Sequence, residues 1–308
     1  MERSLQNQVV LITGAGGGLG RCHALYLAAL GAKLVVNDLG TAVDGGGSGT
    51  SPAEETVAAI RRAGGEAVAD GHGVETMAGA AAMVEAALRA FGGLHAVVNN
   101  AGILRDRSFA KQSEEDWERV LQVHLTGSRN VCQAAWPILA KQNYGRIVLT
   151  LSASGLYGNF GQSNYAAAKA GLLGLMLSLK EEGLRHGIKV NGIAPMARSR
   201  MTEGLLPREL LERLDPRFVS PVVAYLVGAG CAVNGQCWTV GAGRVARAAV
   251  VEGEGFRFPE APGFSPEDIA AHLSEIVALD QAEPLENLRA AALRLLKNTS
   301  RKLRNGDS

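Results

Sequence analysis

The chain opens with a short apolar run, a cluster of glycines and an amphipathic stretch, and this opening most constrains the fold. Val9–Thr13 is rich in β-branched residues and has the length of a buried strand. After the glycines, helical periodicity runs over Leu19–Leu30, and a second strand-like run covers Lys33–Asn37. A strand, a helix and a second strand in this order predict two parallel strands joined by a crossover helix.

The same alternation continues along the chain and predicts an α/β fold with a doubly wound parallel sheet of seven strands. The later strands are expected over Glu66–Ala69, Ala96–Asn99, Arg146–Leu151, Lys189–Ile193 and up to Val240. Helices are expected between them, over 52–63, 78–91, 114–139, 165–186 and 221–227. From residue 252 the composition shifts to prolines, phenylalanines and charges. We therefore expect a sheet domain of residues 1–251 and a C-terminal helical extension of residues 252–308, which would cover the sheet domain or a dimer partner near the substrate entrance.

Charge and hydropathy argue against several classes of protein. The 308 residues carry 31 Lys and Arg against 30 Asp and Glu, whereas nucleic-acid binders rely on many basic contacts to phosphates. No apolar run approaches the roughly 18 residues of a membrane span, and the first residues lack the apolar core of a signal peptide. The four cysteines lie far apart and form no CxxC pair. We expect a cytoplasmic protein with reduced thiols, no metal site, and no nucleic-acid or membrane partner.

The glycine cluster of residues 13–20 lies between the first strand and its helix. Glycines there would let a pyrophosphate approach the backbone, and the helix N-terminus offers N–H groups and the positive end of its dipole. Asp38 ends the second predicted strand. A carboxylate at that position can accept hydrogen bonds from ribose hydroxyls and would repel a 2′-phosphate. These features favour NAD over NADP as a cofactor, although an ordinary glycine turn could carry the same residues.

Three further residues have the chemistry of an acid–base site. Tyr165 and Lys169 are four residues apart on a predicted helix, so their side chains share a face. A free phenol has a pKa of about 10 and is a poor base at neutral pH, and a neighbouring ammonium is expected to lower that pKa. Ser152 ends the fifth predicted strand, at the carboxyl edge where such sheets bind ligands. Its hydroxyl could hold a substrate oxygen next to Tyr165.

Together these motifs resemble the short-chain dehydrogenase/reductase family. TGAGGGLG at 13–20, NNAG at 99–102, Ser152 and the Tyr165–Lys169 pair occur in the family's order and spacing, over about residues 5–245. The resemblance implies a Rossmann-type fold in which Tyr165 is the acid/base, Lys169 holds the nicotinamide ribose and Ser152 orients the substrate. It also implies that the cofactor is bound by Gly14, Gly18, Leu19, Gly20, Asp38, Val74, Asn100, Gly102, Tyr165, Lys169, Pro195, Ala197 and Thr202.

Four longer segments carry a narrower resemblance: VVNDLG at 35–40, AGILRDRSFA at 101–110, SASGLYGNFGQSNYAAAK at 152–169 and IAPMARSRMT at 193–202. They are similar to the (3R)-hydroxyacyl-CoA dehydrogenase part of the peroxisomal multifunctional enzyme type 2 and to its stand-alone bacterial relatives. The resemblance implies an enzyme that uses NAD to interconvert a 3-hydroxyacyl-CoA, of R configuration, and a 3-oxoacyl-CoA. A hydroxysteroid or other secondary-alcohol dehydrogenase would use the same three residues, and a non-catalytic NAD-binding regulator could keep the fold.

Three positions depart from the family pattern. His124 stands where most members have an asparagine that helps to hold a water on the catalytic lysine. Because the narrower group also carries a histidine there, His124 is expected either to keep that catalytic role or to be a buried structural residue. Met196 replaces the glycine that usually follows Pro195, and His72 replaces an aspartate near the adenine. The cofactor contacts at these two positions stay open.

The predicted loops at the same edge hold four arginines and two aromatic residues. The arginines could pair with the phosphates of an acyl-CoA or with carboxylates of the protein, and the aromatic residues could line an apolar pocket or pack beneath a substrate loop. They are Arg105, Arg107, Arg198, Arg200, Tyr157 and Phe160. An apolar stripe of the helix after Tyr165 resembles the face through which family members dimerise, so we expect a homodimer, with a tetramer as the alternative. The stripe comprises Leu172, Leu173, Met176, Leu177 and Leu179.

Overall fold

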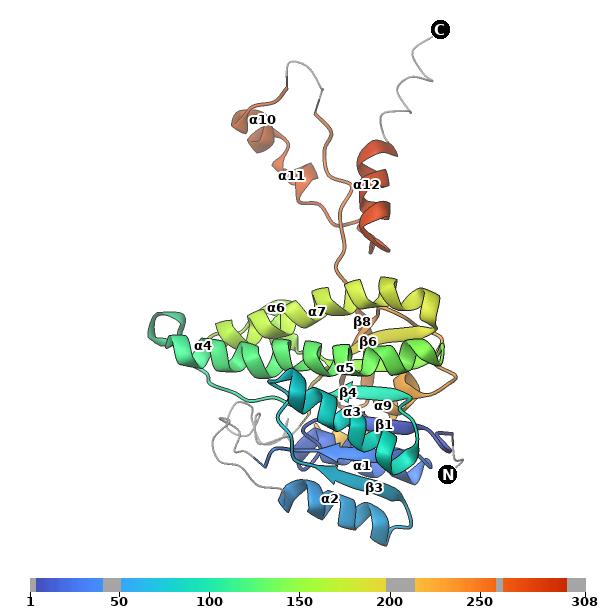
Figure 1. Cartoon of the computed structure of the whole chain (residues 1–308). Helices are drawn as coiled ribbons and strands as arrows, with labels where there is room; N and C mark the ends of the chain where they lie inside the picture. The colour runs from blue at the N-terminus through green and yellow to red at the C-terminus, as the bar shows by residue number, and fades with distance from the viewer. Residues whose placement is uncertain (1–3, 41–50, 198–213, 259–262, 298–308) are drawn as a thin grey trace. The chain divides into compact units, whose positions relative to one another are not determined.

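The computed structural model describes residues 4–40, 51–197, 214–258 and 263–297 (Figure 1). The chain divides into two compact units, Met1–Arg247 and Ala248–Ser308. The first unit is built on one eight-stranded sheet in the order β3-β2-β1-β4-β5-β6-β7-β8. The strands are β1 (Val9–Ile12), β2 (Lys33–Asn37), β3 (Glu66–Asp70), β4 (Ala96–Asn99), β5 (Gly145–Thr150), β6 (Ile188–Pro195), β7 (Cys237–Gly241) and β8 (Arg244–Ala248).

Strands β1 to β7 are paired in parallel, and β1 lies between β2 and β4. Every residue of β1, β4 and β5 is buried, as expected for central parallel strands that are covered on both faces. The chain reverses its direction of winding between β1 and β4, and such a switch point opens a crevice at the carboxyl ends of the strands. The predicted doubly wound parallel fold is confirmed.

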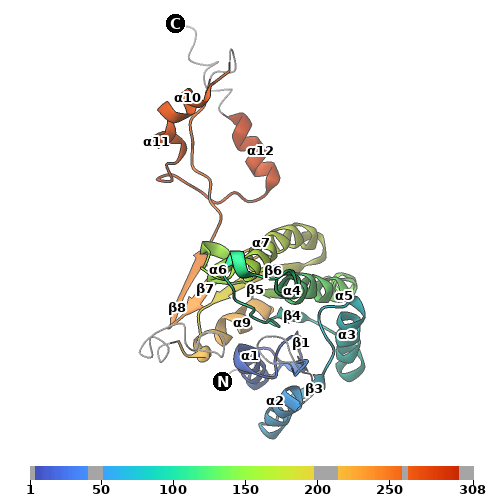
Figure 2. The same cartoon turned by 90° about the vertical axis from the view of Figure 1, so that its left-hand side faces the viewer.

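Helices cover both faces of the sheet (Figure 2). On one face α1 packs against α2 and α9, and on the other α5 packs against α3 and α7. The helices of this unit are α1 (Gly18–Ala29), α2 (Ser51–Arg62), α3 (Met77–Phe91), α4 (Glu114–Leu121), α5 (Gly127–Lys141), α6 (Ala153–Tyr157), α7 (Ser163–Gly183) and α9 (Ser220–Val227). No helix in the described part of the chain is long and apolar enough to cross a membrane.

The sheet has one strand more than the predicted seven. Ala242 and Gly243 connect β7 to β8, and both have a positive φ, 48° and 79°. A two-residue connection of this kind joins antiparallel strands, and its usual sequence signal is Asn-Gly or Asp-Gly. Ala-Gly carries no such signal, so the short edge strand was missed.

The long helix expected over 114–139 is interrupted. The helix α4 ends at Leu121, a π-helix covers Gln122–Thr126, and α5 follows. A π-turn inserts an extra residue into the helical repeat and often marks a functional site. It carries His124, which therefore leaves the helical register that a single helix would impose.

The second unit is small and contains α10 (Pro266–Ala271), α11 (Leu273–Ile276) and α12 (Leu288–Lys297). Ser265 caps α10 in a capping box with Asp268, and Pro266 is the first residue of this helix. An aromatic contact connects the segment before α10 to the junction of α10 and α11, where Phe256 stacks on His272 with ring centres 3.6 Å apart. The role of this unit stays a prediction.

Candidate active site

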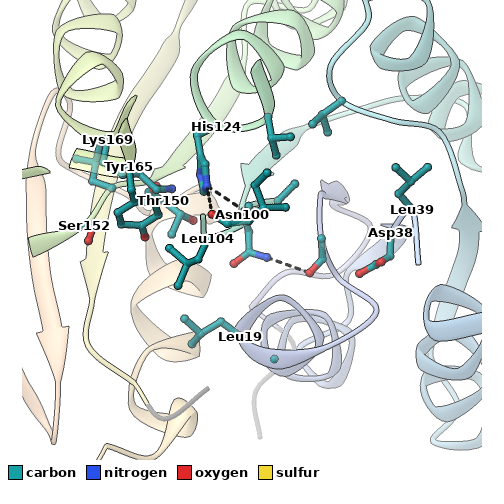
Figure 3. A pocket seen from close by; sticks show the side chains of 18 of the residues that line it. Leu19, Asp38, Leu39, Asn100, Leu104, His124, Thr150, Ser152, Tyr165 and Lys169 are labelled. Atoms are coloured by element: carbon teal, nitrogen blue, oxygen red, sulfur yellow. Dashed lines mark hydrogen bonds between the residues drawn. The ribbon is translucent and has the colours of Figure 1, made fainter. Parts of the chain in front are cut away.

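A cavity of about 330 Å³ opens at the carboxyl ends of the central strands (Figure 3). Its lining comes from the β1–α1 turn, the segments after β2, β3, β4 and β5, the π-helix, and the start of α7. The structure therefore brings together, in one crevice, segments that reach from Gly14 to Ala197 in the sequence.

The glycine turn forms one wall of the cavity. Gly14 has φ +63°, and a Cβ on it would lie 2.8 Å from the Cα of Ala101. Gly18 has φ +51° and, with Leu19, faces the cavity, where a Cβ would meet no atom within 4 Å. The N-cap of α1 is Gly17, so no side chain caps this helix. The turn thus presents backbone at a helix N-terminus, the arrangement that favours a phosphate.

Asn100 holds the glycine turn against the next strand. Its Nδ2 donates to the backbone oxygens of Thr13 and Gly14, each at 3.0 Å, and its own backbone N–H donates to Thr13 Oγ1 at 3.0 Å. Asn100 and Gly102 both line the cavity. Gly20 does not: a Cβ on it would collide with the Gly14 carbonyl oxygen, so its place is the packing of α1 on the turn.

Asp38 lies directly after β2 and lines the same cavity. Its Oδ2 accepts a hydrogen bond from the Gly16 N–H at 2.9 Å, and its Oδ1 accepts one from the Gly40 N–H at 2.8 Å. Because an ionised carboxylate has about four lone-pair sites, two acceptor positions remain. Asp38 can therefore hold a ribose diol while it ties down the glycine turn.

His72 and Val74 line the cavity after β3. The His72 Nδ1 lies 2.9 Å from Asp70 Oδ2, and the side chain is 55% exposed. Val74 is buried, and its carbonyl accepts a hydrogen bond from Asn130 at 3.1 Å. This end of the cavity therefore combines the apolar side chain of Val74 with the polar imidazole of His72.

The other end of the cavity holds Ser152, Tyr165 and Lys169 (Figure 3). Tyr165 and Lys169 lie one turn apart on α7, and the Lys169 Nζ is 5.6 Å from the centre of the Tyr165 ring. Lys169 is buried and donates a hydrogen bond to the Thr150 carbonyl. Ser152 is the N-cap of α6, and its Oγ accepts a hydrogen bond from the Ser154 N–H at 3.1 Å.

The electrostatics of this pair differ from the expectation. Burial raises the pKa of Tyr165, and a hydrogen bond with Ser152 partly opposes the rise. Burial also lowers the pKa of Lys169 to about 7. In the protein alone the pKa of Tyr165 is therefore raised rather than lowered, because burial is the largest cause of its shift. The lowering of this pKa by a protonated Lys169 stays a prediction.

His124 joins this group from the π-helix. Its ring meets the Tyr165 ring edge-on, with ring centres 5.1 Å apart, and its Nε2 lies 2.8 Å from the Ile103 carbonyl oxygen. Burial, and next the charge of Lys169, lower the pKa of His124 to about 3, so the ring is neutral. Its Nδ1 is buried and has no hydrogen-bond partner in the described part of the chain. Gly102 is needed beside it, since a Cβ there would collide with the ring.

The remaining predicted residues divide into three groups. Pro195 and Ala197 line the cavity after β6, whereas Thr202, Arg198 and Arg200 lie outside the described residues. Arg105 pairs with Glu115 at 3.0 Å and Asp116 at 3.1 Å, which is the internal pairing that the sequence left open.

The two aromatic residues were expected to line a pocket or to pack beneath a substrate loop, and the first of these alternatives is wrong for this cavity. Tyr157 is 73% and Phe160 is 90% exposed, and neither lines the cavity. Tyr157 is the last residue of the short helix α6, and Phe160 lies in the segment after it. Ser154, Asn159 and Gln162 line the cavity instead, and the sequence analysis missed them. Their signal was the set of polar side chains that lie, among glycines and apolar residues, between Ser152 and Tyr165.

The family description "short chain dehydrogenase" matches residues 8–208. The chain belongs to the short-chain dehydrogenase family. A short-chain type dehydrogenase/reductase of Mycobacterium tuberculosis is 51% identical over 279 residues, which cover 91% of this chain and 97% of the relative. A hydroxyacyl-CoA dehydrogenase of the same organism is 41% identical over 252 residues, 77% of this chain and 78% of the relative.

The solved structure of the full-length peroxisomal multifunctional enzyme type 2 from Drosophila melanogaster superposes on this short-chain dehydrogenase with a TM-score of 0.80 and 40% identity. The match covers 95% of this chain and 49% of that enzyme, so this chain spans about half the length of the multifunctional protein. The short-chain dehydrogenase is therefore an oxidoreductase of a family whose members typically use a nicotinamide cofactor.

Proposed function

We propose that this short-chain dehydrogenase uses NAD to oxidise a (3R)-hydroxyacyl-CoA to a 3-oxoacyl-CoA. The observation that carries the proposal is the single cavity with Asp38 at one end and Ser152, Tyr165 and Lys169 at the other. The first end suits the ribose of NAD, and the second suits a secondary alcohol. The name of the hydroxyacyl-CoA dehydrogenase relative supports the acyl-CoA class of substrate.

The residues present fit the cofactor. The backbone of the glycine turn would hold the pyrophosphate, Asp38 the adenosine ribose, and Lys169 the nicotinamide ribose. When bound, NAD supplies the acceptor of the hydride, C4 of its nicotinamide ring. The negative charge of Asp38 disfavours the 2′-phosphate of NADP, which is the basis for choosing NAD.

The protein's own part in the reaction is to hold one oxygen atom and to move one proton. The Ser152 hydroxyl holds the substrate's carbinol oxygen by a hydrogen bond, and the Tyr165 phenolate takes the proton of that hydroxyl. Lys169 in its protonated form favours the phenolate. His124 stays neutral, and its Nδ1, which has no hydrogen-bond partner among the described residues, would bind a water next to Lys169. This contact would make His124 a positioning residue in the proton transfer.

The experiment is the formation of NADH, followed at 340 nm, with 3-hydroxyacyl-CoA thioesters of both configurations. Free hydroxysteroids and simple secondary alcohols are run in parallel, and NADP replaces NAD in a matched series. Turnover of the R thioesters with NAD is the expected result. Activity only on free steroids or simple alcohols would agree with the proposed acid–base site but would contradict an acyl-CoA substrate. Cofactor binding without turnover of any substrate would favour a non-catalytic NAD-binding regulator.

We also propose that the protein is a cytoplasmic homodimer, with a tetramer as the alternative. Leu172 and Met176 are buried in the first unit, whereas Leu177 is 36% exposed on the same helix. The exposed part of this stripe is the proposed contact. Light scattering should give the mass of a dimer and, for Leu177→Asp, the mass of a monomer, because a buried charge at the contact would be costly. An unchanged mass would contradict this choice of surface, and cell fractionation tests the location.

A further inference from the structure

A buried amide connects the substrate end of the cavity to an acidic side chain outside its lining. Gln162 is 5% exposed and is the N-cap of α7. Its Oε1 accepts hydrogen bonds from Ser154 Oγ at 2.8 Å and Asn159 Nδ2 at 2.9 Å, and its Nε2 donates to Asp106 Oδ2 at 2.8 Å. The carboxylate of Asp106 is thus held one side chain away from the wall beside Ser152.

The second oxygen of this carboxylate is buried and without a hydrogen bond. Asp106 Oδ1 has no partner among the described residues, and no ion pair within that part of the chain includes Asp106. The Arg105 guanidinium donates to Glu115 and Asp116, and the Arg107 guanidinium donates to the backbone oxygen of Asp106. A negative charge on a buried oxygen is screened far less than one in water, so it acts on its surroundings over a longer distance.

The charge of Asp106 reaches the reacting end of the cavity. Burial raises the pKa of Tyr165, the Ser152 hydrogen bond lowers it, and Asp106 adds to the rise. Of the other titratable groups there, Lys169 has its pKa lowered to about 7 and His124 is neutral. Arg119 also lines the cavity, but it lies on α4 and its Nη1 is 3.6 Å from Glu75.

We propose that Asp106 is a specificity-determining residue that disfavours a negative charge next to the reacting carbinol. The substrate end would then accept a neutral thioester or ester at the neighbouring acyl carbon and reject a free 3-hydroxy acid. The inference deepens the proposed function and rests on it, because a 3-hydroxyacyl thioester is neutral at that carbon whereas the free acid carries a carboxylate.

The test compares methyl 3-hydroxybutyrate with 3-hydroxybutyrate, which differ in this charge and in one methyl group. In the wild-type enzyme kcat/KM should be at least about tenfold higher for the ester. Asp106→Asn removes the charge but keeps an acceptor for Gln162, and it should lower this ratio about tenfold by improving oxidation of the acid. Asp106→Glu keeps the charge and should keep the preference.

Glu115→Gln is the matched control. It removes the same charge from a side chain that is 82% exposed, and Arg105 retains Asp116 as a partner. Its ester-to-acid ratio should equal that of the wild type. An equal ratio in the wild type and Asp106→Asn, or a wild-type enzyme that prefers the acid, would overturn the proposal. If Asp106→Asn does not fold, Asp106→Ser provides the same neutralisation with a hydroxyl that can accept from Gln162.

A binding measurement separates this inference from the proposed function. Methyl acetoacetate and acetoacetate are titrated into the enzyme loaded with NAD, which cannot reduce them, and the tryptophan fluorescence of the protein is followed. The wild type should bind the ester more tightly than the acid, and Asp106→Asn should reduce this difference in affinity about tenfold. That result supports the proposed role of Asp106 even if no hydroxyacyl compound is turned over. Equal affinities for the two ligands in the wild type would contradict the proposed role of Asp106. They would leave the proposed oxidation of hydroxyacyl thioesters untouched.

Discussion

Asp38→Asn tests whether the carboxylate after β2 selects the cofactor. The change keeps the shape of the side chain and removes one negative charge. It also changes the hydrogen bonds, because Asp38 accepts from two backbone N–H groups, those of Gly16 at 2.9 Å and Gly40 at 2.8 Å. Asparagine has one acceptor oxygen, so one of the two N–H groups loses its partner. The expected loss of stability is about 1–2 kcal/mol.

The effect on the cofactor follows from the lost charge. Two unit charges about 4 Å apart interact by about 4 kcal/mol at an effective dielectric constant of about 20, and by about 1 kcal/mol in water. Since each 1.4 kcal/mol is about a factor of ten, removing the repulsion should raise kcat/KM for NADP relative to NAD by about fivefold to about 700-fold. The NAD value itself should fall, because one acceptor for the ribose diol is lost.

The assay measures initial rates at 340 nm with each cofactor at a fixed saturating substrate, together with thermal melting of both proteins. Glu54→Gln, which neutralises an exposed residue on the neighbouring helix α2, is the control and should change neither the ratio nor the melting temperature. If Asp38→Asn melts earlier while the NADP-to-NAD ratio stays constant, the carboxylate only ties down the glycine turn. The argument for NAD would then be refuted.

Three further predictions concern the reacting end and the core. Tyr165→Phe should lower kcat by about a thousandfold while the affinity for NADH, from fluorescence titration, changes less than about threefold, because only the phenol oxygen is removed. His124→Leu should lower kcat by about tenfold or more with little change in KM, and His124→Asn should recover part of it, because asparagine can again bond the Ile103 carbonyl. Buried His23 has its pKa lowered to about 4. Below about pH 6.5 both His23 and His124 bind a proton in the unfolded state, whereas the buried rings of the folded state stay neutral. The free energy of unfolding, measured with urea, should therefore fall by about 4 kcal/mol between pH 7 and 5, and His23→Gln should halve this fall. An equal loss in that variant would contradict the assignment.

The sheet could be predicted from the sequence because its signals are local. Parallel strands that are buried on both faces appear as continuous apolar runs, and β1, β4 and β5 are buried at every position. The crossover helices between them then fix the order of the strands. The edge strand β8 and the π-helix Gln122–Thr126 have no such signal. Their conformations depend on a turn with positive φ and on packing around His124.

The candidate site was predictable where one short motif carries it. The glycine turn, Asp38, and the Tyr165–Lys169 pair are short-range patterns, and the structure places them in one cavity. The exposure of Phe160 and the raised pKa of Tyr165 were not predictable, because both depend on which distant segments cover a side chain. Burial is a tertiary quantity, and no spacing in the sequence reports it.

The two ends of the cavity are therefore built on different principles. The cofactor end consists of backbone at a helix N-terminus and of strand ends, so a few glycines and one carboxylate specify it. The substrate end is a set of side chains from separate loops, with Gln162 as the link between Ser154 and Asp106. Substitutions there can change the charge that the substrate meets while the glycine turn and Lys169 stay in place. For this reason the motif residues predict the class of reaction, and the proposed selection between substrates depends on the side chains that Gln162 holds in place.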